Sequence, residues 1–246
     1  LPDVAVVPSE NFNTVLYTGN GSGALAISGV GFQPDFTWIK SRNSVITGSH
    51  ELHDAVRGAG KRLFSNTNAA ETDFSTVDSF DSDGFTVGLG TGGQNGTNAN
   101  TATFAAWNWK ANGSGSSNTT GSVDSGFSIV SWTGTGTAGT VGHGLSSAPD
   151  IVIVKRRNAT AYWYINLKNI PSQSAQEDMV GVLNETLAID GYNVGSAIFS
   201  NTAPTSTLFN ITTNAVVNAN ASTYIAYCFH SVEGYSKCSS FVGNGS

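Results

Sequence analysis

The chain contains one sequence pattern twice, which indicates that it folds as two copies of the same unit. Residues 34–43 read almost like residues 149–158, at an offset of 115 residues (from 34 to 149). Further along, residues 103–107 match residues 223–227 at an offset of 120 (from 103 to 223), so the second copy carries a few extra residues. Several matched blocks in the same order predict two similar modules.

The repeat also predicts the boundaries of the domains. We expect module 1 over residues 11–111 and module 2 over residues 125–232, joined by a flexible linker at 112–124 that is rich in Gly, Ser, Thr and Asn. Residues 233–246 resemble the start of a module once more, and are predicted to begin a third, truncated one. Residues 1–10, which contain two prolines, are predicted to be a linker from an upstream region.

Composition favours an all-β fold. Charged residues make up only 11% of the chain, against about 25% in typical soluble domains. Most of the polarity comes from Gly, Ser, Thr and Asn, which form turns well and helices poorly. Short strand-like segments separated by turn clusters then predict tandem β-sandwich modules of the jelly-roll or lectin-like type, each with about seven strands.

The strands are expected at these positions. In module 1 they are predicted at residues 14–18, 24–28, 36–40, 50–56, 62–65, 85–88 and 103–110. In module 2 they are predicted at residues 128–133, 151–155, 162–166, 183–189, 208–211 and 223–229, with a single helical turn within 171–179. Large apolar residues that alternate along one strand rarely all face water. We therefore expect the last strand of each module to bury its aromatic pair, Trp107 with Trp109 near Phe36 and Trp38, and Tyr227 with Phe229.

Charge and hydropathy exclude two classes of partner. The net charge is -6, and no basic stretch is longer than residues 155–157, so nothing would neutralise a row of nucleic-acid phosphates. No run approaches the ~18 apolar residues of a membrane span, and membrane insertion is not expected. Cys228 and Cys238 are too few for a disulfide framework, although a bridge between them stays open.

Two motifs raise the question of a metal site. His50 and His53 are three residues apart, whereas a zinc-binding helix needs a spacing of four, and on a strand the two side chains point to opposite faces. We interpret them as polar residues of a half-exposed strand. Asp78, Asp81 and Asp83 form a weak calcium candidate, because the downstream bidentate Glu of a calcium loop is missing. The alternative is an Asx-type turn, and no cofactor is predicted.

Catalysis is not expected. A glycosidase needs two carboxylates that face each other across a cleft, and the acidic residues of module 1 have no matching pair in module 2: Glu51, Asp54, Glu71 and Asp73. Aromatic rings stack on sugars, and the densest aromatic group is at residues 162–164. Strand alternation places Trp163 opposite both tyrosines, which leaves Tyr162 and Tyr164 as candidate ligand-contacting residues.

Several motifs resemble a known family. They are Tyr17-Thr18-Gly19-Asn20-Gly21, residues 34–42, Asp54-Ala55-Val56-Arg57-Gly58, residues 81–88 and residues 106–109, with further matches at 141–145, 224–229 and 234–237. Together they are similar to an uncharacterised repeat domain of large structural proteins in marine tailed phages. In those proteins the repeat often follows a SPRY or lectin-like domain. The resemblance implies a fold, and it supplies no catalytic or binding residues.

The resemblance implies a virion structural protein. We expect a non-catalytic protein on the particle surface, part of a fibre, appendage or capsid decoration. Its expected partners are further copies of itself or other virion proteins, with host-surface glycans as candidate ligands. The alternative is a bacterial extracellular adhesin, or a carbohydrate-binding module of a secreted enzyme, since the composition fits both.

Overall fold

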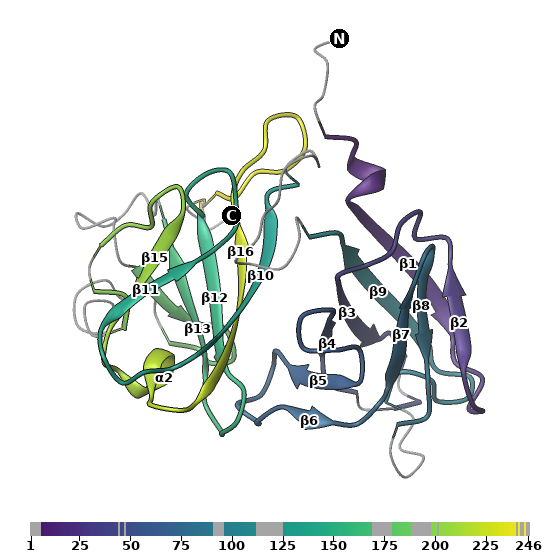
Figure 1. Ribbon diagram of the computed structural model, residues 1–246. Coiled ribbons are helices and arrows are strands. Elements are labelled where there is room, and N and C mark those ends of the chain that lie inside the picture. Colours follow the sequence, from purple (N-terminus) through teal and green to yellow (C-terminus); the bar gives the residue numbers. More distant parts are fainter. Residues whose placement is uncertain are drawn as a thin grey trace. The chain divides into compact units, whose positions relative to one another are not determined.

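The computed structural model describes residues 6–43, 45–46, 48–90, 96–111, 125–168, 179–187, 198–200, 202–239, 241 and 244. The chain divides into two compact units, Leu1–Ala111 and Asn112–Ser246, which contain modules 1 and 2 (Figure 1). Besides strands, the described residues include a 3-10 turn, η1 (Pro8–Glu10), and one helical turn, α2 (Ala215–Asn218). The predicted all-β class is therefore confirmed. The predicted linker, 112–124, lies outside the described residues.

Module 1 contains two antiparallel sheets. The large sheet has the strand order β1 (Phe12–Thr18), β9 (Thr103–Trp109), β3 (Phe36–Ser41), β4 (Glu51–Asp54), β5 (Lys61–Phe64) and β6 (Thr72–Asp73). The small sheet has the order β2 (Leu25–Ser28), β8 (Gly84–Val87) and β7 (Val77–Asp81). The first and last strands of the module thus lie side by side in the large sheet.

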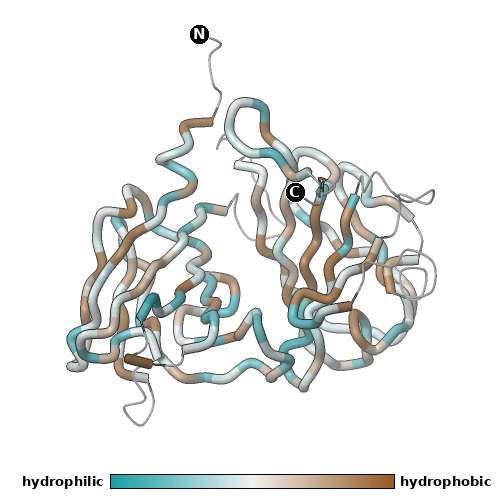
Figure 2. Tube along the Cα trace, turned by 180° about the vertical axis from the view of Figure 1, so that it is seen from behind, coloured by the Kyte–Doolittle hydropathy of each residue, from teal (hydrophilic) through white to brown (hydrophobic). Residues whose placement is uncertain are grey.

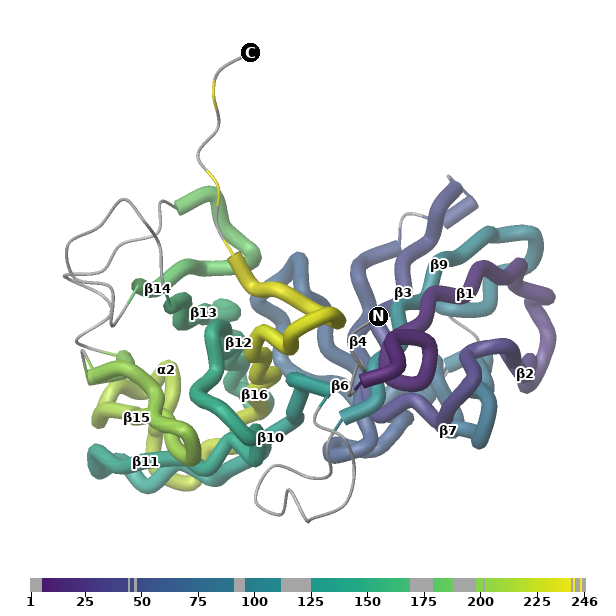
Figure 3. The backbone as a smooth tube through the Cα atoms, turned by 90° about the horizontal axis from the view of Figure 1, so that it is seen from above, coloured from purple at the N-terminus to yellow at the C-terminus, as the bar shows by residue number. Residues whose placement is uncertain are grey.

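Module 2 repeats this topology in its described part, as Figure 3 shows from above. Its large sheet has the order β10 (Phe127–Thr133), β16 (Thr223–Phe229), β12 (Ile151–Arg156), β13 (Trp163–Leu167) and β14 (Met179–Val182). Its small sheet pairs β11 (Gly139–Gly142) with β15 (Leu208–Ile211). The registers of the strands that both modules share also correspond, so positions in these strands have structural equivalents in the other module.

The two sheets of module 1 enclose an apolar core. The large sheet contributes Ile39, Phe104 and Ala106, and the small sheet contributes Phe85 and Val87, all at most 1% exposed. In module 2 the corresponding cluster includes Val152, Val154, Phe209, Tyr224 and Ala226. Figure 2 shows hydrophobic stretches along the strands and hydrophilic ones at many turns. We call the core-facing side of each large sheet its inner face and the opposite side its outer face.

The two tryptophans of β9 do not face this core. Trp107 and Trp109 lie on the outer face and are half-buried, so their predicted burial is only partial and their predicted place in the core is wrong. The inner positions of the strand hold Phe104 and the small Ala106 instead, which lets the small sheet approach closely. The expected neighbour is confirmed, because the rings of Phe36 and Trp109 are 5.3 Å apart.

Module 2 differs at the equivalent pair. Tyr227 is buried at 2% exposure and stacks on Trp163 at 6.2 Å between ring centroids, as expected for a buried aromatic residue. Phe229 is half-buried, so its predicted burial is only partial. The pattern of alternating aromatic residues therefore identified the strand correctly but assigned the wrong face to the core.

A buried asparagine before the last strand of each module forms hydrogen bonds with the turn that follows the first strand. Asn98 accepts a hydrogen bond from the backbone N–H of Asn20 (2.9 Å) and donates to the carbonyl of Ser22 (2.9 Å). Its equivalent, Asn218, accepts from Thr135 N–H (2.8 Å) and donates to the carbonyl of Thr137 (2.6 Å). Both asparagines are fully buried. The buried amides thereby have hydrogen-bond partners and fix the turn after the first strand of each module.

An aspartate also makes the same side-chain to backbone hydrogen bond in both modules. The Asp35 carboxylate accepts the backbone N–H of Ala111 at 2.8 Å, just after the last strand of module 1. The Asp150 carboxylate accepts the N–H of Ser231 at 2.8 Å at the equivalent position of module 2. The asparagine and aspartate residues that recur at equivalent positions therefore fix the backbone conformation in both modules.

Some strands were not predicted. β6 and β7 were missed, because Asp78 and Ser79 have low strand propensity. In module 2, β11, β14 and α2 were also missed. Residues 183–187, the described part of the strand predicted at 183–189, form no strand. The chain turns at residues 183–184, where Asn184 accepts the backbone N–H of Trp163 at 2.9 Å and so ends β14. The predicted helical turn lies outside the described residues except for Met179, which begins β14.

Candidate functional site

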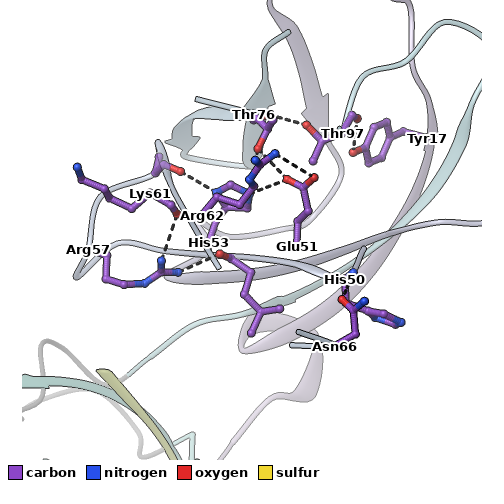
Figure 4. Close-up of polar contacts among 12 residues, drawn as sticks. Tyr17, His50, Glu51, His53, Arg57, Lys61, Arg62, Asn66, Thr76 and Thr97 are labelled. Carbon is purple, nitrogen blue, oxygen red and sulfur yellow. Dashed lines mark hydrogen bonds and ion pairs between the residues drawn. The ribbon is translucent and has the colours of Figure 1, made fainter. Parts of the chain in front are cut away.

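A buried polar cluster lies between the two sheets of module 1 (Figure 4). The Thr76 hydroxyl donates to Glu51 Oε2 at 2.8 Å and lies 3.3 Å from His53 Nε2. The same Glu51 oxygen is 3.5 Å from His53 Nε2. Thr76 and His53 are fully buried and Glu51 is 4% exposed, so the three groups meet in a place that excludes water.

Strand alternation explains how β4 supplies two of these groups. Glu51 and His53 are two residues apart and share the inner face, while Leu52 and Asp54 point outward. All four residues of β4 are buried, so the half-exposed strand predicted here is wrong. The prediction that His50 and His53 point to opposite sides is confirmed, because His50 accepts a hydrogen bond from Trp38 Nε1 at 2.9 Å on the outer face.

Arg62 of β5 completes the cluster. Its guanidinium lies 3.9 Å from the Phe74 ring centroid and 4.6 Å from that of Phe64, which are cation–π distances. Its Nη1 is 3.6 Å from Glu51 Oε1, and its buried Nε has no hydrogen-bond partner. Desolvation lowers the pKa of Arg62, and the Glu51 charge opposes that effect. The guanidinium is therefore oriented more by the two rings than by the carboxylate.

Two further hydrogen bonds connect the cluster to the loop before β9. Thr97 Oγ1 donates to the Thr76 carbonyl at 2.6 Å, and the Tyr17 hydroxyl donates to the Thr97 carbonyl at 2.8 Å. Burial, and secondarily the Glu51 charge, raise the pKa of Tyr17 well above its usual value. The Tyr17 hydroxyl is therefore held as a neutral donor, which fixes the segment behind Thr76.

The remaining carboxylates of this region belong to a separate network. Arg57 Nε donates to the Asp54 carboxylate, and Arg57 Nη1 donates to Glu71 Oε2 at 3.2 Å. Lys61 pairs with Asp73 at 2.6 Å in a more exposed position. The carboxylates considered for a glycosidase pair therefore each contact a cationic or hydroxyl group.

The cluster has no counterpart among the described residues of module 2. The strand registers place Tyr164, Asn166 and Val180 at the positions of Glu51, His53 and Arg62. None of the three substitutes carries a charge. The charged cluster is therefore a property of module 1 rather than of the repeat.

The structure separates the calcium-candidate carboxylates. Asp81 accepts hydrogen bonds from the hydroxyls of Ser79 (2.8 Å) and Thr86 (2.7 Å). Asp83 accepts the backbone N–H groups of Gly29 (3.0 Å) and Gly31 (2.6 Å), which lowers its pKa. The third, Asp78, lies against Gly88. Within the described residues, no three His, Cys, Asp or Glu side chains come together as a metal site.

The tyrosines proposed for ligand contact lie in different surroundings. Tyr162 is 39% exposed, just before β13, whereas Tyr164 is half-buried against the core of module 2. Burial, with a smaller effect from Tyr162, raises the pKa of Tyr164. Trp163 between them is fully buried and points to the other face, as predicted. Only Tyr162 exposes much of its ring.

Sequence reasoning missed Thr76 and Arg62. Neither belongs to a motif, and their contact with Glu51 depends on how β4 and β5 pack against the segment before β7. A signal was present in the comparison of the two modules, because Arg62 is charged where module 2 has an apolar Val180. Charged residues that interrupt a repeated apolar pattern would have pointed to this cluster.

Comparisons with known proteins identify a family. Among the described residues, no helix is long and apolar enough to cross a membrane. No curated protein matches the chain, and no solved structure matches it. The model of a domain of unknown function, DUF7483, matches residues 7–246, nearly the whole chain, and the protein therefore belongs to this family.

Proposed function

We propose that this protein is a non-catalytic structural component on the surface of a tailed-phage particle, in a fibre, appendage or capsid decoration. The observation that carries the proposal is that the recurring polar residues hold the backbone. Asn98 and Asn218 make equivalent bonds, and so do Asp35 and Asp150. These backbone contacts recur in both modules, whereas the described residues form the charged cluster only in module 1.

The arrangement of carboxylates supports a non-catalytic role toward external substrates. Asp54 and Glu71 bind one arginine, and Glu51 is enclosed between the sheets. A hydrolase of polysaccharides needs two carboxyl groups that flank a bond of the substrate. A buried carboxylate such as Glu51 does not meet a polymer.

The virion assignment rests on the resemblance of the motifs to repeats of marine tailed-phage structural proteins. Two features are compatible with it. Module 1 contains no cysteine, which suits folding in a reducing cytoplasm before assembly. A surface rich in Ser, Thr and Asn offers weak hydrogen bonds to host glycans, and many copies on one particle would multiply them by avidity.

The decisive experiment is to locate the protein in purified particles. We expect peptides of both modules in the mass spectrum of gradient-purified virions, and antibody labelling on the particle surface by electron microscopy. The isolated chain should bind host cells and release no sugar from their polysaccharides. Absence from particles, together with secretion from a bacterium, would favour the adhesin. Steady sugar release that Asp54→Asn abolishes would contradict the non-catalytic role.

A further inference from the structure

The buried cluster of module 1 has the geometry of a reaction centre. His53 Nδ1 lies 2.8 Å from the carbonyl oxygen of Ala59. A carbonyl oxygen only accepts, so in the neutral ring Nδ1 carries the proton and Nε2 has a free lone pair. That lone pair faces the Thr76 hydroxyl at 3.3 Å. A hydroxyl, a base within reach of it, and a group that orients the base are the parts of an activated nucleophile.

The electrophile would be the Glu51 carboxyl group, which contacts this hydroxyl. The Thr76 oxygen is 2.8 Å from one oxygen of the Glu51 carboxyl group, and Arg62 Nη1 is 3.6 Å from the other oxygen. We propose that Thr76 and Glu51 condense to an ester, a covalent cross-link between the two sheets of module 1.

The step balances without any outside reagent. The step starts from the His53–Glu51 pair, whose Nε2 and Oε2 lie 3.5 Å apart and share one proton. Transfer of that proton to Oε2 gives a neutral acid beside a neutral imidazole. The Thr76 oxygen attacks the carboxyl carbon while its proton passes to His53 Nε2, and a carbon–oxygen bond forms. His53 then returns that proton to Oε2, which is 3.5 Å from Nε2, the bond from carbon to Oε2 breaks, and one water molecule leaves.

Arg62 stabilises the intermediate of this step. Negative charge develops on Oε1, the oxygen nearest to the guanidinium. A cation fixed before the reaction, at the atom where charge appears, is an effective way to lower the barrier in a site that excludes water. The two rings that sandwich Arg62 provide that fixation.

The product is protected by the same burial. Glu51, His53 and Thr76 are at most 4% exposed, so hydroxide has no access to the ester. The link would join β4 of the large sheet to the residue before β7 of the small sheet, across 25 positions of sequence. Module 1 has no cysteine, and an ester would provide a covalent link that a reducing cytoplasm does not remove.

Mass spectrometry of the full 246-residue chain tests the proposal. We expect the intact mass to be lower than that of the sequence by one water molecule. A digest of the denatured protein should contain the Glu51 and Thr76 peptides joined, and hydroxylamine should separate them because it cleaves esters. An intact mass equal to that of the sequence, with both peptides recovered separately, would overturn the cross-link.

Single substitutions distinguish a loss of the reaction from a loss of the fold. Thr76→Val should abolish the mass deficit, and His53→Asn, the residue that module 2 has at this position, should abolish or greatly slow it. Circular dichroism should show that these variants are folded. A mass deficit that persists in folded Thr76→Val would place the dehydration elsewhere and also overturn the proposal.

The chain offers a matched control. Thr86 donates to the Asp81 carboxylate at 2.7 Å in the same module, with no imidazole within the pair and only partial burial. Thr86→Val should keep the full mass deficit, and no digest should contain the Asp81 and Thr86 positions cross-linked. A cross-link at that pair as well would show that hydroxyl–carboxylate contact alone suffices, and would overturn the role of His53.

Discussion

Asn98 and Asn218 lie 120 positions apart in the sequence and occupy the same place in two separate modules, each fully buried. Each accepts the backbone N–H of the residue that follows the first strand by two positions and donates to a carbonyl two residues further on. The pair shows that a polar side chain, and not only the apolar pattern, defines the repeated unit.

Replacing either asparagine with alanine should destabilise the module that carries it. Asn98→Ala leaves the N–H of Asn20 and the carbonyl of Ser22 without their partner. Each intramolecular hydrogen bond contributes about 0.5–1.5 kcal/mol, so we expect a loss of about 2 kcal/mol in the free energy of unfolding. Calorimetry and urea titration measure it, and Asn218→Ala should reproduce the loss in module 2. Unchanged unfolding would contradict this role.

The two faces of β9 should respond differently to truncation. Phe104 is fully buried between the sheets, and Phe104→Ala should cost about 3–5 kcal/mol of unfolding free energy. Trp107→Ala, on the outer face, should cost clearly less although tryptophan is larger, because Trp107 is only half-buried. Chemical denaturation of both variants compares them. A larger loss for Trp107 would show that the outer face is the principal core.

Lys155 should make stability depend on pH. Burial, and secondarily Arg156, lower its pKa to about 8, whereas an unfolded lysine titrates at about 10.4. Between these values the unfolded chain binds more protons, so the free energy of unfolding rises with pH across the window and the contribution is lost as pH falls through about 8. Lys155→Met should flatten this rise in urea titrations. Lys40→Met, at the equivalent position of module 1, is the control and should keep it.

The two thiols should differ in reactivity. Cys228 is fully buried, and desolvation raises its pKa to about 12, with a hydrogen bond from Ser128 opposing the effect. The thiolate is the reactive species, so Cys228 should not react with Ellman's reagent in the native protein at neutral pH. Cys238, half-buried with a raised pKa, should react slowly. One thiol should therefore titrate in the native state and two in urea, and two native thiols would contradict the burial of Cys228.

Local patterns predicted most of the framework and little of the cluster. The alternation in β3, with Thr37 and Ile39 on one face, is correct because side chains alternate on any strand. Which face meets the small sheet depends on distant partners, and this is why Trp107 was placed in the core. The hydrogen bonds of Asn98 follow only from the folded loops.

The cluster required information that no single segment contains. Glu51 and His53 were noticed separately, one as a carboxylate and one as a metal ligand to be rejected. Thr76 brings them into one network from a position 25 residues away, and a threonine in a chain rich in threonine gives no signal. Comparison of equivalent positions in the two modules would have been more informative than any motif search.

The pairing of the first and last strands in each module has a mechanical consequence. β1 runs antiparallel to β9 with Phe12 opposite Trp109, and β10 runs antiparallel to β16 with Phe127 opposite Phe229. The chain therefore enters and leaves a module at the same end of its large sheet. A force that pulls the two ends of a module apart therefore breaks the hydrogen bonds between its first and last strands one after another. Duplication of such a module lengthens the chain and leaves the strand pairing of the existing module unchanged.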